Sequence, residues 1–291
     1  MNDPNLMILA AGVSSRMKQS LRSNDSLDPK FKREAQSKPK AMMSVGVGNR
    51  PFLDYLLYNA GEAGYRDVLI VVSEEDTSIQ RHYGAAGNNK TPHGLRMSFA
   101  VQQIPAGESN PLGTADAVLQ GMDARSDWKG KQFTVCNSDN LYSKKAFQTL
   151  LESRYPNAMI DYDRTALGFD ASRILKFSIT QKDDEGFLTG IIEKPTDDEV
   201  ERVRGKNGTV GVSMNIFRLA YDEVLPFVST IPVHPVRNEK ELPTAIARMV
   251  RERPKSVFAF PLAERVPDLT SIDDLKAVEE YVSREFKEVP W

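Results

Sequence analysis

The sequence has few of the residues on which several kinds of site depend. Its 291 residues include one cysteine, Cys136, and three histidines, His82, His93 and His234. A single cysteine cannot form a disulfide within the chain, and it excludes a cysteine-rich zinc site. The histidines share no metal-ligand spacing, so we interpret them as surface or core residues. Cys136 lies in an apolar run and is interpreted as a small buried hydrophobic residue.

An excess of one charge and long hydrophobic runs are also absent. The net charge is -2, which gives no general attraction to nucleic acid or to an anionic membrane. No uninterrupted apolar run approaches the roughly 20 residues that a membrane helix needs. The first nine residues lack the basic and apolar regions of a secretion signal. We therefore expect a cytoplasmic protein without nucleic-acid or membrane partners.

The apolar residues that are present predict alternating strands and helices. Two short apolar runs, at 6–10 and 68–72, are typical of buried strands of a parallel sheet, and further strands are predicted at 41–45, 99–102 and 133–137. Helical spacing between them, as from Phe52 to Ala60, predicts crossover connections in a doubly wound sheet. Beyond residue 155, a predicted hairpin pairs 174–180 with 188–192, which indicates a mixed sheet.

The stretch from Leu6 to Lys40 contains the first candidate site. An apolar strand runs into Leu9-Ala10-Ala11-Gly12, and Arg16 and Lys40 follow. A turn of small residues can bring backbone N–H groups close to an anion, and the two cations add full charges. The pattern favours binding of nucleotide phosphates. An ordinary strand-to-helix turn of an α/β protein uses the same residue types.

A polar segment, Lys18 to Lys38, joins the two cations of this stretch and shows almost no apolar periodicity. It predicts a long mobile loop, and loops of this length are commonly functional or disordered. Two interpretations stay open. The segment is a lid that becomes ordered when nucleotide binds, or it is a tolerated surface insertion.

Taken in order, these and later motifs resemble the nucleoside-diphosphate-sugar pyrophosphorylases, which are sugar-1-phosphate nucleotidyltransferases. The resemblance extends from Leu6 to about Val282. The matching residues are Leu9-Ala10-Ala11-Gly12, Arg16-Met17, Pro39-Lys40, Gln102, Leu112-Gly113-Thr114-Ala115, Asp139, Glu193-Lys194-Pro195 and Asp268. Each motif is short, and the specific feature is their ordered combination.

The resemblance implies a three-layer, Rossmann-like mixed sheet of the nucleotide-diphospho-sugar transferase (GT-A-like) type. It implies a single large domain at 1–291, with a nucleotide-binding half at about 1–155 and an acceptor half at about 156–291. The implied reaction is attack by a sugar-1-phosphate oxygen on the α-phosphorus of a nucleoside triphosphate, with release of pyrophosphate. Mg²⁺ is the implied cofactor. The implied partners are the nucleotide and a phosphorylated small-molecule acceptor, and the chain is a candidate homo-oligomer.

Three cations form the implied catalytic set. Loop amides around Ala11 and Gly12, together with Arg16, would hold the triphosphate and favour the leaving pyrophosphate. Lys40 would contact the reacting phosphates, and Lys194 would pair with the sugar phosphate. A phosphate monoester is largely ionised at neutral pH, so the attacking oxygen needs no general base. Positioning and charge neutralisation then carry the catalysis.

The resemblance assigns base recognition to residues farther along the chain. Gln102 would hydrogen-bond the base, with Gln103 as the alternative if the register is shifted by one. Gly113 and Thr114 lie where the backbone would approach the base or the ribose. The same Gly-Thr pair could simply start a helix.

Metal and sugar contacts are assigned to four other residues. Asp139 and Asp268 would bind Mg²⁺, which suits one or two carboxylates together with phosphate oxygens. Glu193 would accept hydrogen bonds from sugar hydroxyls, and Asn215 is a candidate sugar contact. Each has a simpler alternative. Asp139 could cap a turn, Glu193 could lie at a solvated hairpin end, and Asp268 could cap the last helix.

The sequence departs from the resembled pattern at three places. A serine replaces the usual second glycine in Val13-Ser14-Ser15, as in relatives that use cytidine triphosphate or transfer to molybdopterin. The segment from Arg16 to Lys40 is longer than usual. The expected Asn-x-Gly-x-Tyr strand reads Val-Ser-Met-Asn-Ile-Phe at 212–217, so sugar contacts there are open.

Two alternatives to a sugar-1-phosphate nucleotidyltransferase remain at this point. One is a cytidylyltransferase for a non-sugar phosphate such as phosphocholine, and the other is a catalytically inactive relative that binds nucleotide sugars. Intact Arg16, Lys40, Asp139 and Lys194 argue against the inactive relative. An NAD-binding Rossmann protein is excluded, because no Gly-x-x-Gly continuation follows Gly12.

Overall fold

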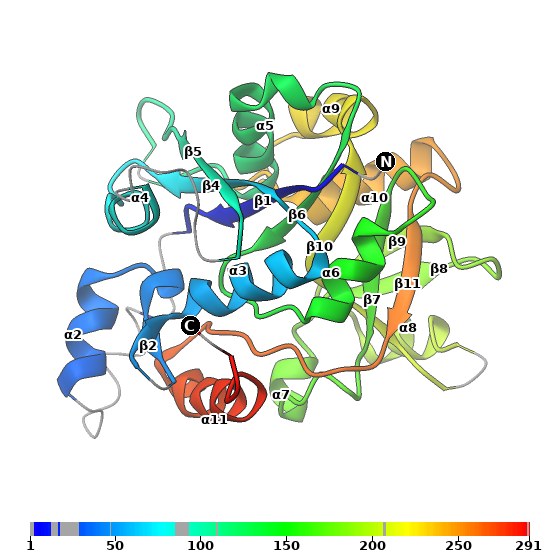
Figure 1. The fold of residues 1–291 in the computed structure, drawn as a ribbon. Coiled ribbons are helices and arrows are strands. Elements are labelled where there is room, and N and C mark those ends of the chain that lie inside the picture. The colour runs from blue at the N-terminus through cyan, green and yellow to red at the C-terminus, as the bar shows by residue number, and fades with distance from the viewer. Residues whose placement is uncertain are drawn as a thin grey trace.

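The computed structural model describes residues 3–12, 17, 29–46, 48–84, 93–108, 110–205, 208–289 and 291. Its main sheet has the strand order β11-β7-β10-β6-β1-β4-β5, with β8 and β9 attached beside β10 (Figure 1). Its strands are β1 (Asn5–Ala10), β4 (Asp67–Ser73), β5 (Arg96–Gln102), β6 (Gln132–Asn137), β7 (Ala158–Asp163), β8 (Ile179–Lys182), β9 (Leu188–Ile192), β10 (Gly211–Ala220) and β11 (Phe258–Leu262). Along that path only β10 runs antiparallel to its neighbours.

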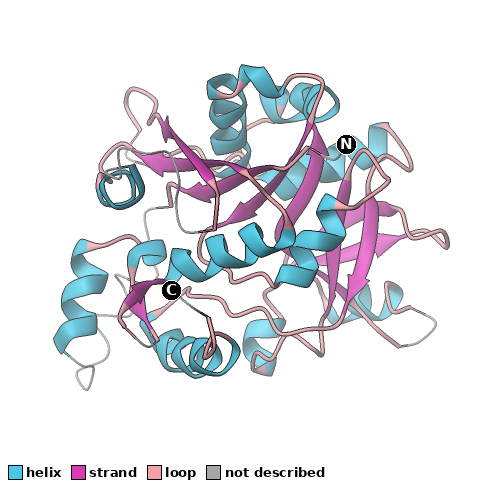
Figure 2. Cartoon of the chain, viewed as in Figure 1, coloured by secondary structure: helices cyan, strands magenta, loops and turns pink. Residues whose placement is uncertain are grey.

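Helices cover both faces of this sheet (Figure 2). In Figure 1, α5, α9 and α10 lie above the sheet, and α3, α6 and α11 lie below it. The helices are α2 (Pro29–Ser37), α3 (Phe52–Ala63), α4 (Ser78–Gly84), α5 (Thr114–Ala124), α6 (Lys144–Leu151), α7 (Ala171–Ile174), α8 (Asp197–Arg202), α9 (Tyr221–Thr230), α10 (Leu242–Glu252) and α11 (Leu275–Glu285). The arrangement has three layers.

Strand β1 shows why the sheet lies in the middle. All six of its residues are buried. Leu6 and Ile8 join the apolar cluster that contains α3, α6 and α11, whereas Met7 and Leu9 join the cluster that contains α5, α9 and α10. Because neighbouring side chains of a strand point to opposite faces, a strand covered on both faces is apolar throughout. The predicted mixed α/β class with a mostly parallel sheet is confirmed.

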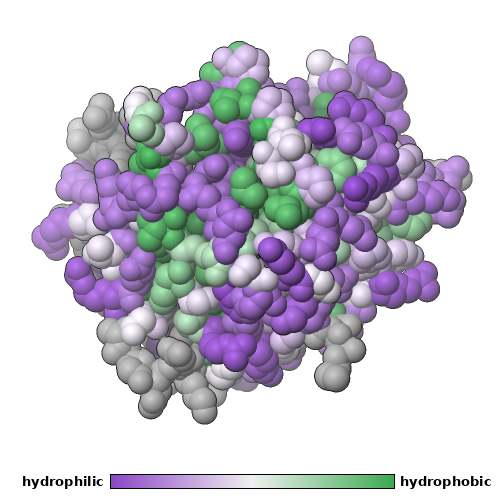
Figure 3. All heavy atoms as spheres, turned by 90° about the horizontal axis from the view of Figure 1, so that it is seen from above, coloured by the Kyte–Doolittle hydropathy of each residue, from purple (hydrophilic) through white to green (hydrophobic). Residues whose placement is uncertain are grey.

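The outer surfaces of the covering helices are polar. Viewed from above, the surface is mainly hydrophilic, with hydrophobic residues interspersed (Figure 3). The apolar residues of α10, including Ile246 and Met249, are buried against the sheet. Among the helices of the described residues, none combines the length and the apolar character that crossing a membrane requires.

The prediction of a loop from Lys18 to Lys38 was wrong for its second half, where α2 forms. Its apolar content is low, and side-chain contacts attach it to the neighbouring strand. The Glu34 carboxylate accepts the backbone N–H and the hydroxyl of Ser44, each at 2.8 Å, and Ala35 is buried. Residues 18–28 lie outside the described part of the chain, and so does that part of the predicted lid.

Two short segments near this helix also differ from expectation. The strand predicted at 41–45 is a 3₁₀ helix, Lys40–Met42, followed by β2 (Ser44–Val45). Strand β2 pairs with β3 (Arg50–Pro51) in a separate two-stranded ladder, and α11 packs against it. In the predicted hairpin, the first strand starts only at Ile179, and residue 174 belongs to α7.

Strand β7 was not predicted from the sequence, although it lies between β10 and β11. Its run Ala-Met-Ile-Asp-Tyr-Asp is interrupted by Asp161, which is 3% exposed. That carboxylate accepts a hydrogen bond of 2.5 Å from the Thr180 hydroxyl, and it also pairs with Lys182. Two side chains of β8 therefore compensate the cost of burying the Asp161 carboxylate. The sequence around Asp161 does not indicate that these partners exist.

Candidate nucleotide and acceptor site

A cleft of about 760 Å³ lies at the carboxyl ends of the parallel strands. In open α/β sheets this edge is where ligands bind. The cleft is lined by all candidate site residues that belong to the described ranges: Leu9, Ala10, Ala11, Gly12, Lys40, Gln102, Gly113, Thr114, Asp139, Glu193, Lys194, Asn215 and Asp268. Arg16 lies outside those ranges.

The small-residue turn after β1 lies directly beside the end of β6. Leu9 pairs with Asn137 in parallel register, and the Ser138 N–H donates to the Leu9 carbonyl at 3.1 Å. Gly12 is exposed, and a Cβ built on it meets no atom within 4 Å. Packing within the described protein therefore does not require glycine at this position. The turn leaves open space on the side of the cleft.

Two of the predicted residues, Lys40 and Asp139, form an ion pair across this space. Lys40 Nζ lies 3.1 Å from Asp139 Oδ2, and the two side chains are 11% and 26% exposed. Lys40 comes from the start of the 3₁₀ helix after α2, and Asp139 follows β6. Two segments distant in sequence thus bring a cation and a carboxylate together where phosphates would lie.

Asp268 is brought to the same place by backbone hydrogen bonds between two loops. The Leu269 N–H donates to the Asp139 carbonyl at 2.8 Å, and Asn140 and Asp268 form an antiparallel bridge. Asp268 does not cap the last helix. The N-cap of α11 is Asp274, and Ser271 is the N-cap of the 3₁₀ helix Ile272–Asp274 that precedes it.

The Asp268 carboxylate has close partners on both oxygens. Arg173 Nη2 lies 2.8 Å from Oδ2, and the Thr270 hydroxyl donates to Oδ1 at 2.7 Å. Burial raises the pKa of Asp268, repulsion from Asp139 raises it further, and Arg173 opposes both. A cation between the two carboxylates would relieve this repulsion.

The donor set fits a magnesium ion held jointly with substrate. No group of three or more His, Cys, Asp or Glu side chains capable of holding a metal occurs among the described residues. Mg²⁺ is usually bound by one or two carboxylates, with waters and substrate phosphates completing its octahedron. Asp139 and Asp268 supply two carboxylates of that kind. They do not form a complete protein cage.

Gln102 lines the cleft with its amide nitrogen already engaged. Nε2 donates to the Gly113 carbonyl at 3.0 Å and to Asp116 Oδ2 at 2.8 Å, and the residue is 2% exposed. An amide nitrogen has two hydrogens, so only the carbonyl oxygen of Gln102 remains for a ligand. Gln103, the alternative, is exposed and does not line the cleft.

Gly113 and Thr114 begin α5 and contact the segment that precedes α10. Gly113 has φ +92°, and a Cβ there would lie 2.8 Å from the Lys240 carbonyl. The Thr114 hydroxyl accepts the Leu242 N–H at 2.9 Å, and the Ala115 N–H donates to Lys240 at 2.8 Å. The expectation that this pair starts a helix is therefore met. The same residues also connect the two sides of the cleft.

On the acceptor side, Glu193 belongs to a group of three charged residues. Arg237 Nη2 lies 2.6 Å from Glu193 Oε2 and 2.6 Å from Glu241 Oε2. Burial and repulsion from Glu193 raise the pKa of Glu241 to about 7, although Arg237 opposes them.

Two further residues of the acceptor side have left-handed backbone, Lys194 at φ 48° and Asn215 at φ 56°. Asn215 lies within the irregular stretch of β10, between Ser213 and Phe217.

Six charged residues of the cleft were missed from the sequence: Glu108, Arg173, Lys176, Arg237, Glu239 and Glu241. They lie on short or irregular segments, where charged residues are typical of solvated surface. A polar run, Arg-Asn-Glu-Lys-Glu at 237–241, precedes α10 and was the only available signal. Nothing local distinguishes such a run from an exposed loop. Only the tertiary fold brings it beside Glu193.

Comparison with known proteins supplies the family. The family model described as nucleotidyl transferase matches residues 35–252. The chain belongs to the nucleotidyl transferase family. Among curated proteins, the glucose-1-phosphate adenylyltransferase of Corynebacterium efficiens is 27% identical over 150 residues, which are 52% of this chain and 36% of that protein.

A second relative extends the match. The glucose-1-phosphate adenylyltransferase of Anaeromyxobacter dehalogenans is 25% identical over 193 residues, which are 66% of this chain and 42% of that protein. The chain thus spans less than half the length of these curated relatives. Its similarity to them concerns a nucleotidyl transferase region. The resemblance inferred from the motifs is confirmed at the level of the family.

Proposed function

We propose that this chain transfers a nucleoside monophosphate from a nucleoside triphosphate to a sugar-1-phosphate, with Mg²⁺, and releases pyrophosphate. One observation carries the proposal. A single cleft at the carboxyl edge of the sheet is lined by a small-residue turn, the Lys40–Asp139 pair, Asp268 and Lys194. Family membership and the similarity to glucose-1-phosphate adenylyltransferases support the same reaction class.

In the proposed reaction, each wall of the cleft serves one substrate. The turn from Leu9 to Gly12 borders the triphosphate, and Lys40 neutralises charge on the reacting phosphates. When a phosphate arrives, Lys40 can exchange its contact with Asp139 for one with a phosphate oxygen. Bound Mg²⁺ would offset the negative charge that accumulates on the phosphates. Asp139 and Asp268 are the residues that would hold it.

The acceptor occupies the opposite wall in this proposal. Lys194 pairs with the acceptor phosphate, and Glu193 and Asn215 face its hydroxyls. Because the phosphate oxygen is already largely ionised, the chain needs to align the nucleophile and stabilise charge rather than remove a proton. The absence of a histidine from the cleft lining agrees with this requirement within the described residues. The two halves of the chain would act as a single domain.

The reaction can be tested by measuring pyrophosphate release. Four nucleoside triphosphates would be combined with several hexose-1-phosphates and with phosphocholine, with and without Mg²⁺. We expect turnover with a hexose-1-phosphate only when Mg²⁺ is present. If phosphocholine is the only acceptor that supports turnover, the acceptor is a non-sugar phosphate and not a sugar-1-phosphate. Nucleotide-sugar binding without any turnover would indicate an inactive relative.

Asp139→Asn tests the proposed metal carboxylate. We expect it to lower turnover by on the order of a thousandfold, comparable with removing one charge-stabilising group from other active sites. The melting temperature and circular dichroism should show that the fold is intact. Asp127→Asn is the matched control, because Asp127 is 61% exposed and pairs with Arg125 at the opposite edge of the sheet. If the two variants are equally active, Asp139 is not a ligand of the metal.

A further inference from the structure

A histidine side chain organises the turn that brings Arg237 to the cleft. Nδ1 of His234 accepts the backbone N–H groups of Val236 and Arg237, each at 3.2 Å. Two backbone bonds close the same turn: His234 N–H to the Glu239 carbonyl at 2.8 Å, and Asn238 N–H to the His234 carbonyl at 2.9 Å. We call residues 234–241 the bridging segment. Its first residue acts here as a hydrogen-bond acceptor.

The bridging segment joins the two sides of the cleft. On the nucleotide side, Lys240 N–H donates to Leu112, and Asn238 Nδ2 donates to Glu108 at 2.8 Å. On the acceptor side, Arg237 pairs with Glu193. Neighbouring Val236 is 86% exposed, so apolar packing contributes little at the tip of the turn. Its conformation therefore depends mainly on polar contacts, among which the imidazole makes two.

We infer that His234 is a positioning residue. Its imidazole, which accepts two backbone N–H groups at Nδ1, holds the bridging segment so that Arg237 reaches Glu193 on the acceptor wall. The inference rests on the proposed function for its kinetic consequence, because Glu193 would bind the hydroxyls of the acceptor. His234 itself does not line the cleft. It acts through Arg237.

The two hydrogen bonds of the turn depend on the lone pair of His234 Nδ1. An imidazole nitrogen without a hydrogen accepts hydrogen bonds. A side chain without an acceptor at this position would leave the backbone N–H groups of Val236 and Arg237 without this partner.

Other charged groups lie near the turn. Arg237, Glu239 and Lys240 belong to the bridging segment itself, Glu108 lies in the loop before α5, and Glu193 follows β9. Burial and Glu193 raise the pKa of Glu241, at the start of α10, to about 7. A test of His234 must therefore compare variants at one pH, so that the charge state of Glu241 does not differ between measurements. A replacement that keeps a hydrogen-bond acceptor at position 234 completes the comparison.

Asparagine preserves a hydrogen-bond acceptor at this position. Asn and Asp side chains commonly accept the N–H of the residue two positions on, in the geometry that His234 uses here. His234→Ala loses the acceptor altogether. His82→Asn is the matched control, because His82 lies on α4 and does not line the cleft. Glu241 is unchanged in all three variants.

The first measurement is amide hydrogen exchange at Val236 and Arg237 at pH 8, where free histidine is neutral. We expect faster exchange in His234→Ala than in the wild type. His234→Asn and His82→Asn should retain wild-type protection. This readout does not need turnover, so it tests the positioning even if the proposed reaction is wrong. Equal exchange in His234→Ala and the wild type would overturn the inference.

The second measurement is steady-state kinetics with the acceptor that the pyrophosphate assay identifies. At pH 8 we expect His234→Ala to raise the acceptor KM by about tenfold, the equivalent of losing one or two hydrogen bonds. The nucleotide KM and kcat should change by less than about twofold. His234→Asn and His82→Asn should keep the acceptor KM of the wild type. If His234→Ala exchanges faster at Val236 and Arg237 but keeps the wild-type acceptor KM, the kinetic consequence is wrong and the positioning of the turn stands.

Discussion

At the scale of single residues, Glu241 makes the acceptor wall sensitive to pH in its own right. Burial and the nearby Glu193 raise its pKa from 4.5 to about 7. The folded protein therefore holds this proton more tightly than the unfolded chain does. The stabilisation is fully present below pH 4.5, and it is lost as the pH rises through 7. Above pH 7 the folded protein carries a buried charge that unfolding would relieve.

Glu241→Gln should remove this penalty. The increase in the free energy of unfolding that Glu241→Gln causes should be about 2 kcal/mol larger at pH 8 than at pH 5. Urea denaturation at the two pH values measures the difference. Glu252→Gln is the control, because Glu252 lies on α10 and is 47% exposed. Its effect on the free energy of unfolding should be the same at both pH values. An identical effect of Glu241→Gln at both pH values would contradict the pKa shift.

A cleft residue could be predicted from the sequence when its own strand or helix places it in the cleft. Asp139 lies directly after a buried strand, and the carboxyl ends of parallel strands meet at one edge, so its place follows from local pattern. Arg173 and Arg237 reach the cleft from the short helix α7 and from the bridging segment. Their positions depend on contacts with Asp268 and Glu193 that are distant in sequence. No local pattern encodes those contacts.

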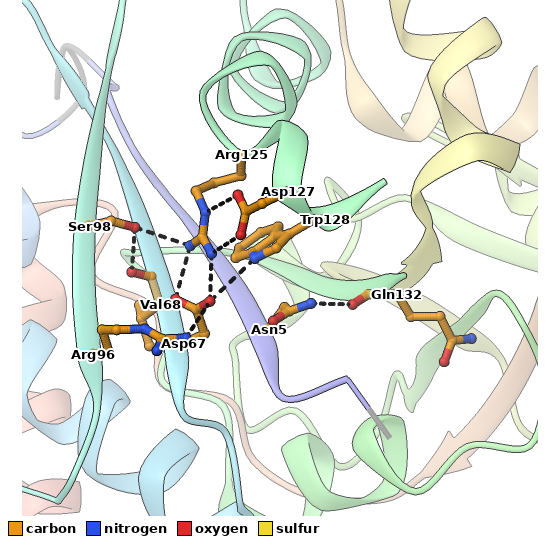
Figure 4. A network of polar contacts seen from close by, with 9 residues as sticks. All are labelled: Asn5, Asp67, Val68, Arg96, Ser98, Arg125, Asp127, Trp128 and Gln132. Carbon is orange, nitrogen blue, oxygen red and sulfur yellow. Dashed lines mark hydrogen bonds and ion pairs between the residues drawn. The ribbon is translucent and has the colours of Figure 1, made fainter. Parts of the chain in front are cut away.

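At the scale of elements, a polar network joins the beginnings of β4 and β5 to the end of α5, and beside it Asn5 of β1 donates to the Gln132 carbonyl (Figure 4). Asp67, the first residue of β4, accepts Arg125 Nη1 at 2.9 Å and Arg96 Nη2 at 3.0 Å. Burial raises the pKa of Asp67, but the two arginines outweigh it and lower the pKa to about 2. The network lies at the opposite edge of the sheet from the cleft. Its contribution is therefore to stability rather than to substrate binding.

Asp67→Asn should destabilise the fold at neutral pH. The depressed pKa corresponds to roughly 2 kcal/mol, and two arginines left without a charged partner add to the loss. The stabilisation is present above the ordinary pKa near 4 and is lost as the pH falls toward 2. The effect on unfolding free energy should thus be clear at pH 7 and small at pH 2. Asp127→Asn, at an exposed member of the network, should cost less than about 1 kcal/mol at pH 7.

Elements with strong apolar patterns were predicted, and elements that depend on tertiary contacts were not. Because helices cover both faces of these strands, the central residues of β1 and β4 are all apolar, and those of β6 include one polar residue, Thr134. Helix α2 has little apolar content, and hydrogen bonds to Ser44 connect it to β2. Strand β7 contains a buried aspartate whose partners come from β8. In both cases the stabilising group lies outside the segment.

At the scale of the whole molecule, strand β10 links the two halves of the chain. It comes from the second half, yet it pairs with β6 of the first half on one side and with β7 on the other. We expect the halves to unfold in one cooperative transition, because separating them would break both ladders. Calorimetry should give a single peak with equal calorimetric and van't Hoff enthalpies. Two resolved transitions would show that the halves are separate folding units.

The placement of β10 also has a consequence during synthesis on the ribosome. Chains emerge from the N-terminus at about 5–20 residues per second, and N-terminal parts begin to fold first. Strands β1, β4, β5 and β6 can assemble as soon as they emerge, but one edge of β6 then stays unpaired until Gly211–Ala220 follows. An open strand edge is a template for pairing with other chains. A nascent chain that stalls before β10 should consequently be prone to aggregate, whereas one that stalls after it should not.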